Sequence, residues 1–407
     1  MKMKILIIAH DFVPNTPRLT LYEDLANEFI RQGHTVSAIT PDPSLDAPYV
    51  IDQFEHLKVY RFKSGRIKNV NRVLRAVNET LLSRTAWNVL KKELINDKHD
   101  LILYPSPSIF WGGLARRIKK TWNVPAILII RDIFPQWVID LGLIKSYSPI
   151  AYYFKHFEKK TYSAADVIAV QSPNNKQWML DHHHLNKPIE VLYNWINENP
   201  IEVRETKYRQ SLNLEEKVVF FYGGNMGAAQ EMMNIVRLAK NLHNEPRAHF
   251  VLVGDGDESH LIQKTIKDQA IVNMTFLPLV SNQEHTDMLN EFDVGLISLD
   301  RRHTTHNLPG KLLKYMAMSK PIFGPVNPGN DLLTMIPDYK AGFVSVSGDD
   351  GDLAGKAKLL LSDETRRDCG KNSRKLLSSF FTAAIAADKI IEIYNDCSIG
   401  SNIQEKL

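Results

Sequence analysis

Short apolar runs alternate with longer helical patterns along the whole chain. KILIIA, DLILY and VPAILII in the first half, and VVFFYGG, HFVLVG and DVGLISL in the second, are each followed by a helical pattern. A strand that is buried on both faces reads as a continuous apolar run, and its parallel neighbour is reached through a crossover helix. The alternation therefore predicts α/β domains built on doubly wound, Rossmann-like parallel sheets.

The length of 407 residues exceeds what one hydrophobic core normally supports, so we expect two domains. A polar, charge-rich stretch, NENPIEVRETKYRQSLNLEEK, interrupts the alternation near the middle. We predict an N-terminal domain over residues 1–196, a linker with a short helix over 197–216 and a second domain over 217–380. The segment 381–407 contains a helical pattern at 383–396 and is predicted to pack back on the first domain. Further helices are expected over 21–32, 110–121, 151–163, 229–242 and 282–291.

The composition fits a globular protein, with 44% hydrophobic and 24% charged residues and a net charge of +4. The apolar run Ile5–Ala9 is too short for a signal sequence or a membrane span. The two cysteines, Cys369 and Cys397, offer neither a disulfide framework nor zinc spacing, which is typical of a reducing cytosol. We expect a cytoplasmic protein with no nucleic-acid partner.

Positive charge is concentrated in residues 61–93, where nine basic residues face two acidic ones. The segment RIKNVNRVLRAVNETLLSRTAWNVLKKEL places Leu, Val and Trp at helical spacing among these charges. Such a basic amphipathic helix is a candidate for an anionic membrane surface, peripheral to the inner face of the cytoplasmic membrane. An ordinary solvated helix that covers a sheet explains the segment equally well.

Ligands of doubly wound sheets bind at the carboxyl ends of the strands, and two such domains facing one another would enclose an inter-domain cleft. FFYGGNMGAAQEM is a strand, a glycine-rich turn and a helix start. Gly223, Gly224 and Gly227 allow backbone N–H groups to wrap a phosphate at the helix N-terminus. The alternative is that three glycines only make a tight strand-to-helix turn.

HNLPGKLLKYMAMSKPI is predicted to form a helix that opens at Pro309 and carries lysine in its first turns. Helix N-termini hold partial positive charge, so lysine at that end suggests that an anion binds there. Winding at about 100° per residue separates two faces. The predicted core face holds Leu312, Leu313, Met316 and Ala317, and the opposite face holds Lys311, Lys314, Tyr315 and Met318. Lys311 lies next to the cation-rich DRRHTTHNLPG segment and suits a leaving nucleoside diphosphate, whereas Lys314 is better explained as solvated.

Two further strand ends carry polar residues. Asp255 and Asp257 in LVGDGDES are spaced to bind Mg²⁺, although a turn in which Asp255 bonds its own backbone explains them better. Arg131 and Asp132 end the run VPAILIIRD. Asp132 is a candidate to orient an acceptor hydroxyl or to accept its proton, and a local cap on the strand end is the alternative.

These motifs in this order resemble the retaining nucleotide-sugar glycosyltransferases of family 4, which have the GT-B fold. The resemblance covers essentially the whole chain, through RQGHTVSAITP, VLYNWIN, FYGGNMG, VGDGDE and PGKLLKYMAMSKPI. YPSPS, IIRDIFPQW and HDFVPNTPRLT look most like the branch that adds amino-deoxysugars, such as N-acetylfucosamine, to lipid-linked glycans of surface polysaccharides such as O-antigen and capsule (lipopolysaccharide biosynthesis).

The resemblance implies a role for each domain. The second domain would bind the donor, a UDP-sugar, through Gly223, Gly224, Asn225, Gly227, Asp255, His306, Lys311 and Lys314. The first domain would bind a glycan or polyprenyl-diphosphate-linked acceptor, with Asn15, Arg18 and Ser106 near its pyrophosphate. Asp132, Arg131 and Lys311 are the catalytic candidates. The resemblance further implies retention of configuration without a metal or another cofactor.

The chain departs from the family pattern at several positions. Many members carry two Glu residues eight positions apart, and the matching positions hold His306 and Lys314. Asn225 stands where an Arg often follows the two glycines. Two other functions remain open, a nucleotide-sugar epimerase of the same fold and a non-catalytic GT-B partner protein. The epimerase would need paired carboxylates near the second-domain loops, and we expect none there.

Overall fold

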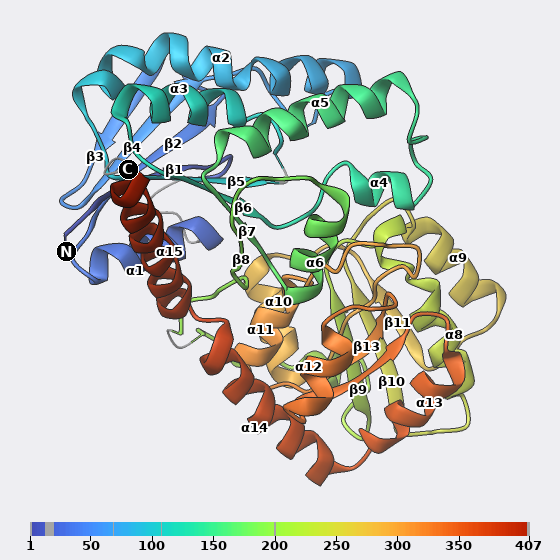
Figure 1. The fold of residues 1–407 in the computed structure, drawn as a ribbon. Helices are drawn as coiled ribbons and strands as arrows, with labels where there is room; N and C mark the ends of the chain where they lie inside the picture. Colours follow the sequence, from blue (N-terminus) through green and yellow to red (C-terminus); the bar gives the residue numbers. More distant parts are fainter. Residues whose placement is uncertain (1, 13–19, 68, 107, 199–200, 405–407) are drawn as a thin grey trace. The chain divides into compact units, whose positions relative to one another are not determined.

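The computed structural model describes residues 2–12, 20–67, 69–106, 108–198 and 201–404 (Figure 1). The chain divides into two compact units, each built on one sheet. The first unit comprises Met1–Asn197 and Ala383–Leu407, and the second comprises Glu198–Thr382. The stretch that we expected to link two domains therefore belongs almost entirely to the second unit. There the Arg209 guanidinium donates a 2.6 Å hydrogen bond to Asp293.

The first sheet has the order β3-β4-β2-β1-β5-β6-β7-β8, and all its neighbouring strands are parallel except β3 and β4. Its strands are β1 (Lys4–Ile8), β2 (Thr35–Asp42), β3 (Tyr49–Gln53), β4 (Leu57–Lys63), β5 (Leu101–Ser106), β6 (Ala126–Ile130), β7 (Val167–Val170) and β8 (Ile189–Val191). The direction of winding reverses between β1 and β5. In doubly wound sheets ligands bind at such a reversal.

Helices cover both faces of this sheet, as Figure 1 shows. They are α1 (Leu21–Arg31), α2 (Arg72–Asn96), α3 (Gly112–Trp122), α4 (Gln136–Asp140), α5 (Pro149–Ala164), α6 (Pro173–His182) and α15 (Ala383–Gln404). One core holds side chains of α2, α3, α5 and α6, among them Leu90, Leu114 and Tyr162. The core on the other face holds side chains of α1 and α15.

The second sheet has the order β11-β10-β9-β12-β13-β14, with every neighbouring pair parallel. Its strands are β9 (Val218–Gly223), β10 (Ala248–Val253), β11 (Met274–Leu277), β12 (Val294–Leu296), β13 (Ile322–Val326) and β14 (Gly342–Val346). This is the strand order of a dinucleotide-binding Rossmann domain, with its reversal between β9 and β12. The predicted fold class, Rossmann-like doubly wound domains, is confirmed.

The helices of the second unit also lie on both faces of their sheet. They are α7 (Tyr208–Ser211), α8 (Met233–Asn241), α9 (Ser259–Asp268), α10 (Asn282–Glu291), α11 (Lys311–Ala317), α12 (Leu332–Asp338), α13 (Asp350–Leu359) and α14 (Asp363–Phe380), with a 3-10 turn, η1, at Ala228–Gln230. Phe220 packs into the core beneath α8 and α13. Its neighbour Phe221 points the other way, and its ring centroid lies 5.2 Å from that of His285 in α10.

Two expected elements differ from the structure. The basic stretch 61–93 is not all helical: residues 61–63 belong to β4, where Arg61 pairs with Asp42 at 2.9 Å and with Asp52 at 2.7 Å, and the helix begins only at Arg72. The helix expected over 229–242 begins as η1 and breaks at Glu231, whose φ is +43°. The α-helix proper then starts at Met233. Within the described part of the chain, no helix combines the length and apolarity needed to span a bilayer.

The last helix, α15, anchors the end of the chain to the first unit. Ala387 and Ile390 are fully buried in the core beside α1. The Gln32 amide donates a 2.8 Å hydrogen bond to Asp388 at the edge of this contact. The amphipathic pattern that predicted the helix is thus matched by a buried face.

We predict that Ile390→Ala lowers the unfolding free energy of the first unit by about 2–5 kcal/mol, because it leaves a cavity beneath α15. All six tryptophans lie between residues 87 and 195, so urea unfolding followed by tryptophan fluorescence reports on this unit. Asn395→Ala, on the exposed face of the same helix, is the matched control. An equal loss in both variants would contradict the packing described.

Candidate functional site

The turn that follows β9 lies at the strand reversal of the second sheet. β9 is buried throughout, and it ends at Gly223. Gly224 has φ +136°, a conformation that side-chain-bearing residues rarely adopt. The loop after β10 crosses the turn so closely that a Cβ on Gly254 would lie 2.0 Å from the Gly224 carbonyl oxygen. Glycine at these positions lets two loops meet at the strand ends.

The backbone amides of this turn already have partners inside the unit. The Gly224 N–H donates to the Val253 carbonyl at 2.9 Å, and the Met226 N–H donates to the Asp255 carbonyl at 2.9 Å. The Gly227 N–H donates to the Gln230 side chain at 3.1 Å. In the structure the Gly224 amide is thus used by the neighbouring loop and the Gly227 amide by Gln230 of the same loop. That these amides wrap a phosphate stays a prediction.

Lys311, the first residue of α11, reaches the same turn. Its Nζ lies 3.4 Å from the centroid of the Tyr222 ring, and a Cβ on Gly224 would be 3.7 Å from it. Burial lowers the pKa of Lys311 to about 7. Among the described side chains, none forms a salt bridge with it that would offset that cost. The ammonium is held by the face of an aromatic ring, which attracts cations.

Lys314 lies one helical turn further along and contacts α10. Its Nζ donates to the Thr286 hydroxyl at 2.5 Å and lies 3.4 Å from Nδ1 of His285. Burial lowers the pKa of this lysine as well. The reading of Lys314 as a solvated side chain is therefore wrong, because α10 packs against this face of α11.

His285 is a site residue that the sequence analysis missed. Its Nε2 occupies the space that a Cβ on Gly223 would need, only 2.0 Å from that position. Burial, followed by the charges of Lys314 and Lys311, lowers the pKa of His285 to about 4, so the ring is neutral near pH 7. The Lys314 ammonium, 3.4 Å from Nδ1, favours the tautomer that carries its proton on Nε2. The signal available in the sequence was a His in the first turns of a helix that follows a strand.

The predicted faces of α11 need one correction. Tyr315 was assigned to the solvent face but is fully buried, and its hydroxyl donates to the Leu296 carbonyl at 3.0 Å. A Cβ on Gly295 of β12 would lie 2.4 Å from the Tyr315 ring. A helix of seven residues covered by both the sheet and α14 has no wide solvent face.

Three other predicted donor-site residues, Asn225, Asp255 and His306, contact residues of their own or neighbouring loops. The Asn225 amide donates to Gln230 at 2.8 Å. The Asp255 carboxylate accepts the Gly256 N–H at 2.8 Å, which is the turn that we preferred over a Mg²⁺ site. His306 is half-buried near Gly329, and burial lowers its pKa. In the described ranges, no group of three or more His, Cys, Asp or Glu side chains is arranged to hold a metal ion.

Carboxylates gather beside η1, contrary to the expectation that these loops lack them. Asp300, four residues after the end of β12, is 2% exposed and accepts a hydrogen bond from the Arg302 guanidinium at 2.5 Å. Burial and the charges of Asp300 and Glu231 raise the pKa of Glu258. The Glu231 carboxylate accepts the Ser347 hydroxyl at 3.0 Å. Sequence spacing could not reveal this group, because its members come from three different loops.

The first unit carries a hydrogen-bonded network at the carboxyl ends of its strands. Arg131 Nε donates to Asn194 at 3.2 Å, and Asn194 donates to Gln171 at 3.2 Å. The Gln171 amide in turn donates a hydrogen bond to the Arg131 carbonyl, so the three residues form a closed network. Gln171 and Asn194, which follow β7 and β8, were missed. This network supports the alternative that Arg131 ties the strand ends together.

Ser106 and Asp132 lie at the same edge. The Ser106 hydroxyl donates to the Asp132 carbonyl at 3.3 Å, and the Asp132 side chain is half-buried. Burial raises the pKa of the nearby Tyr22 to about 12, and the Arg131 charge opposes that rise. Asn15 and Arg18, the other acceptor-side predictions, lie outside the described residues.

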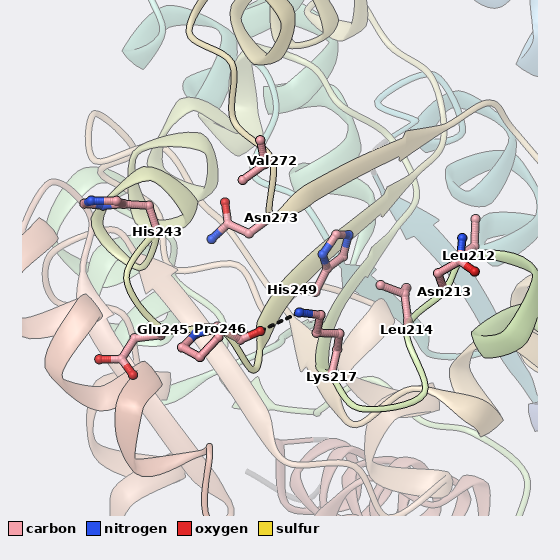
Figure 2. Close-up of a pocket in the computed structure, with 11 residues that line it drawn as sticks. Leu212, Asn213, Leu214, Lys217, His243, Glu245, Pro246, His249, Val272 and Asn273 are labelled. Carbon is pink, nitrogen blue, oxygen red and sulfur yellow. Dashed lines mark hydrogen bonds between the residues drawn. The ribbon is translucent and has the colours of Figure 1, made fainter.

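A separate pocket of about 280 Å³ lies at the opposite, amino-terminal edge of the second sheet (Figure 2). Lys217, His249 and Asn273 are among its lining residues, and Lys217 donates to the Pro246 carbonyl at 2.6 Å. Its lining includes none of the predicted site residues. Ligands of doubly wound sheets bind at the other edge, so this pocket is not the candidate site.

We predict that Gly223→Ala destabilises the second unit by about 1–3 kcal/mol, because the added methyl group would overlap the His285 ring. The double variant Gly223→Ala/His285→Ala should recover most of that loss. Gly355→Ala is the control, since nothing lies within 4 Å of its Cβ position and alanine in a helix is favoured by about 0.5–1 kcal/mol. Hydrogen exchange of peptides from β9 and β10 measures the effect. No recovery in the double variant would argue against the contact.

Lys311→Met should stabilise the unliganded second unit fully below about pH 7 and progressively less above it. The pKa is about 7 in the folded protein and near 10.5 in the unfolded chain, so the unfolded state binds more protons between these values. Stability of the parent therefore rises with pH across this window. The advantage of Lys311→Met should shrink from pH 7 to pH 10 in the same hydrogen-exchange measurement, whereas a constant advantage would mean that the ammonium is not buried.

Two family models match the chain, one on each half. Residues 20–199 match the model described as Glycosyltransferase Family 4, and residues 203–376 match the one described as Glycosyl transferases group 1. The boundary between the two matches falls close to the division between the two units of the structure.

Curated relatives carry glycosyltransferase names. The chain is 23% identical over 220 residues to the probable glycosyltransferase WbjE of Pseudomonas aeruginosa, covering 53% of this chain and 55% of WbjE. It is 22% identical over 342 residues to the putative colanic acid biosynthesis glycosyl transferase WcaI of Escherichia coli K12, covering 78% of this chain and 81% of WcaI. The first of these alignments thus spans about half of the relative's length.

Solved structures share the fold over nearly the full length. Sucrose-phosphate synthase from Thermosynechococcus elongatus superposes with a TM-score of 0.72 at 15% identity, covering 98% of this chain and 100% of that one. HepE from Anabaena, in complex with UDP and glucose, gives a TM-score of 0.65 at 15% identity, covering 97% and 100%. This likeness shows the shared GT-B fold. The two family models, which together span residues 20–376 apart from 200–202, show that the chain belongs to the glycosyltransferases of the family 4 and group 1 type.

Proposed function

We propose that the protein transfers a sugar, with retention of configuration and without a metal, from a UDP-linked donor to a glycan or polyprenyl-diphosphate-linked acceptor. The reaction would serve surface polysaccharide synthesis at the inner face of the cytoplasmic membrane. The observation that carries the proposal is the Lys311 ammonium beside Gly224, half-buried and held by the Tyr222 ring.

An ammonium that is partly removed from water and that no described carboxylate pairs with carries a desolvation cost, and a bound anion would offset that cost. When the glycosidic bond to phosphate breaks, negative charge grows on the leaving diphosphate. A cation fixed where that charge develops stabilises the transition state more than the ground state. Lys311 would therefore hold the phosphate next to the sugar and lower the barrier to its departure.

His285 and Lys314 extend the same site. The neutral imidazole has its Nε2–H at the Gly223 backbone, and Lys314 fixes the ring from the other side. The resulting site presents N–H donors, which suit phosphate oxygens. At the positions that match the family's two Glu residues stand Lys314 and His306, so recognition of the nucleoside must use other groups.

The first unit would bind the acceptor. Asp132 would orient the acceptor hydroxyl and take its proton, and Arg131 would hold the strand ends in place around it. Ser106, with Asn15 and Arg18, would contact the acceptor's pyrophosphate. These assignments rest on family resemblance and on the common edge that Ser106, Arg131 and Asp132 share.

The comparisons support the substrate class. UDP is bound to HepE, and WcaI is named for colanic acid biosynthesis. A third relative, 24% identical over 214 residues, is the N-acetyl-alpha-D-glucosaminyl L-malate synthase of Bacillus anthracis. Its name supports the proposal that the transferred sugar is an N-acetylated amino sugar, here an amino-deoxysugar.

One observation favours a second candidate, a nucleotide-sugar epimerase. Glu231, Glu258 and Asp300 gather at the same edge of the second sheet, and the raised pKa of Glu258 suits a general acid or base. Incubation with UDP-sugars in the absence of any acceptor separates the two functions. Interconversion of the sugars would favour the epimerase, and an unchanged donor would favour transfer.

We predict that Lys311→Ala lowers kcat/KM for the sugar nucleotide by about 10²–10³-fold, because it removes a charge that the leaving diphosphate needs. Affinity for UDP should fall by about 10–100-fold, as expected when a charged hydrogen bond is lost. Transfer of labelled sugar from UDP-linked donors to polyprenyl-diphosphate-linked glycans and calorimetry with UDP measure the two effects.

Lys264→Ala is the matched control, since this lysine is exposed on α9 of the same unit and pairs only with Asp268 four residues away among the described side chains. It should retain parental values in both assays. Turnover of Lys311→Ala within about twofold of the parent, well under 1 kcal/mol, would remove Lys311 from the mechanism.

A further inference from the structure

The first three turns of α2 lie against no core. From Val73 to Leu81 no residue is buried, and Leu82 is the first side chain of the helix to enter the core beneath it. Four aliphatic side chains of this stretch are exposed, Val73 by 75%, Leu74 by 44%, Val77 by 49% and Leu81 by 45%. Exposed aliphatic side chains at this density are unusual on a helix that only covers a sheet.

These side chains form one stripe. At about 100° per residue, Val73, Val77, Leu81 and Leu74 fall within an arc of about 100°. The same arc continues toward the end of α2 with Arg84, Lys91 and Lys92, all exposed. One face of the helix is therefore apolar in its first half and cationic in its second.

The segment that leads into α5 repeats this chemistry. Leu143, Tyr147, Ile150 and Tyr152 are 59%, 70%, 48% and 63% exposed. Lys145, Lys155 and Lys159 are exposed among them. Residues 141–160 contain a single carboxylate, Glu158, which is only 6% exposed. The solvent-exposed surface of this segment therefore consists of lysine, tyrosine and aliphatic side chains, and it has no exposed carboxylate that would neutralise the lysines.

The two segments lie in one region of the first unit. The hydroxyls of Thr80 in α2 and Tyr153 in α5 are hydrogen-bonded to one another. Figure 1 shows the two helices in the same layer, above the first sheet. We call the exposed side chains of residues 73–81, 84, 91–92 and 143–159 the α2–α5 surface.

We propose that the α2–α5 surface docks on an anionic lipid bilayer. A helix with an aliphatic stripe and flanking lysine and arginine lies in the plane of the membrane interface. Tyrosine is favoured at that depth, because its ring is apolar and its hydroxyl remains hydrated. Basic side chains near the surface are attracted by anionic headgroups within a Debye length. A protein partner with an acidic, apolar face is the competing occupant, and a second copy of this chain would have to bring like charges together.

The surface lies in the first unit and is independent of the donor site in the second, although a bilayer fits the lipid-linked acceptor of the proposed function. Cosedimentation of the full chain with phosphatidylcholine vesicles, with and without phosphatidylglycerol, tests the proposal. We expect binding to the mixed vesicles that weakens at least tenfold without phosphatidylglycerol and that falls as salt is added.

Two variants separate the contributions. Val77→Ser/Leu81→Ser removes aliphatic contacts, and Lys155→Glu/Lys159→Glu reverses charge. Each should weaken vesicle binding at least tenfold, and the charge variant should also lose most of the salt dependence. Leu261→Ser/Lys264→Glu is the matched control, since α9 of the second unit also exposes an aliphatic side chain, by 51%, and a lysine. It should bind vesicles as the parent does.

UDP binding by calorimetry is measured on every variant. A surface variant that keeps the parental UDP affinity but no longer binds vesicles supports the docking surface. A parent that does not bind UDP would contradict the proposed donor site and would not bear on the docking surface. The proposal would be overturned if the parental protein did not bind vesicles that contain phosphatidylglycerol, or if the surface variants bound them as the parent does. Concentration-dependent dimers that the Val77→Ser/Leu81→Ser variant abolishes, without any vesicle binding, would assign the surface to a second copy of the chain.

Discussion

Burial of parallel strands on both faces is the constraint on which the rest of this structure depends. Two neighbouring parallel strands must be joined by a connection that crosses back over the sheet, usually a helix, so the carboxyl ends of the parallel strands meet at one edge. At the reversal between β9 and β12 the crossover helices leave in opposite directions, and the loops there have room for a ligand. Gly223, Lys311 and Asp300 lie at a strand end, a helix start and a loop of that edge because of this topology.

The chemistry of the edge follows from what the loops do to one another. Backbone amides of the loop after β9 donate hydrogen bonds to carbonyls of β10 and of the loop after it. Positive charge at this edge therefore comes from side chains. Lys311 lies over Tyr222, and His285 fills the space above Gly223. Two lysines flank a neutral imidazole there, and the result is a donor-rich patch whose electrostatic cost an anion would relieve.

Much of the fold and part of the site could be predicted from the sequence. Apolar runs located the buried strands, and the helices expected over 21–32 and 282–291 begin where α1 and α10 begin in the structure. Lys311 was identified because a lysine at a helix start demands an explanation. Glu231 and Asp300 could not be identified, because nothing in the local pattern says which neighbouring loops they will meet. For His285 the pattern indicated only a His in the first turns of a helix, and not its contact with Gly223.

The sequence by itself determined the elements and their order, because apolar periodicity and helix capping act over a few residues. Only the tertiary structure decided which charges are buried, since burial depends on what the other loops and helices cover. Tyr315 and Lys314 belong to the face of α11 that we assigned to solvent. Tyr315 is nevertheless buried against β12, and Lys314 is hydrogen-bonded to Thr286 of α10. The first turns of α2 show the reverse, because a pattern compatible with an ordinary covering helix extends beyond the core and leaves its aliphatic stripe exposed.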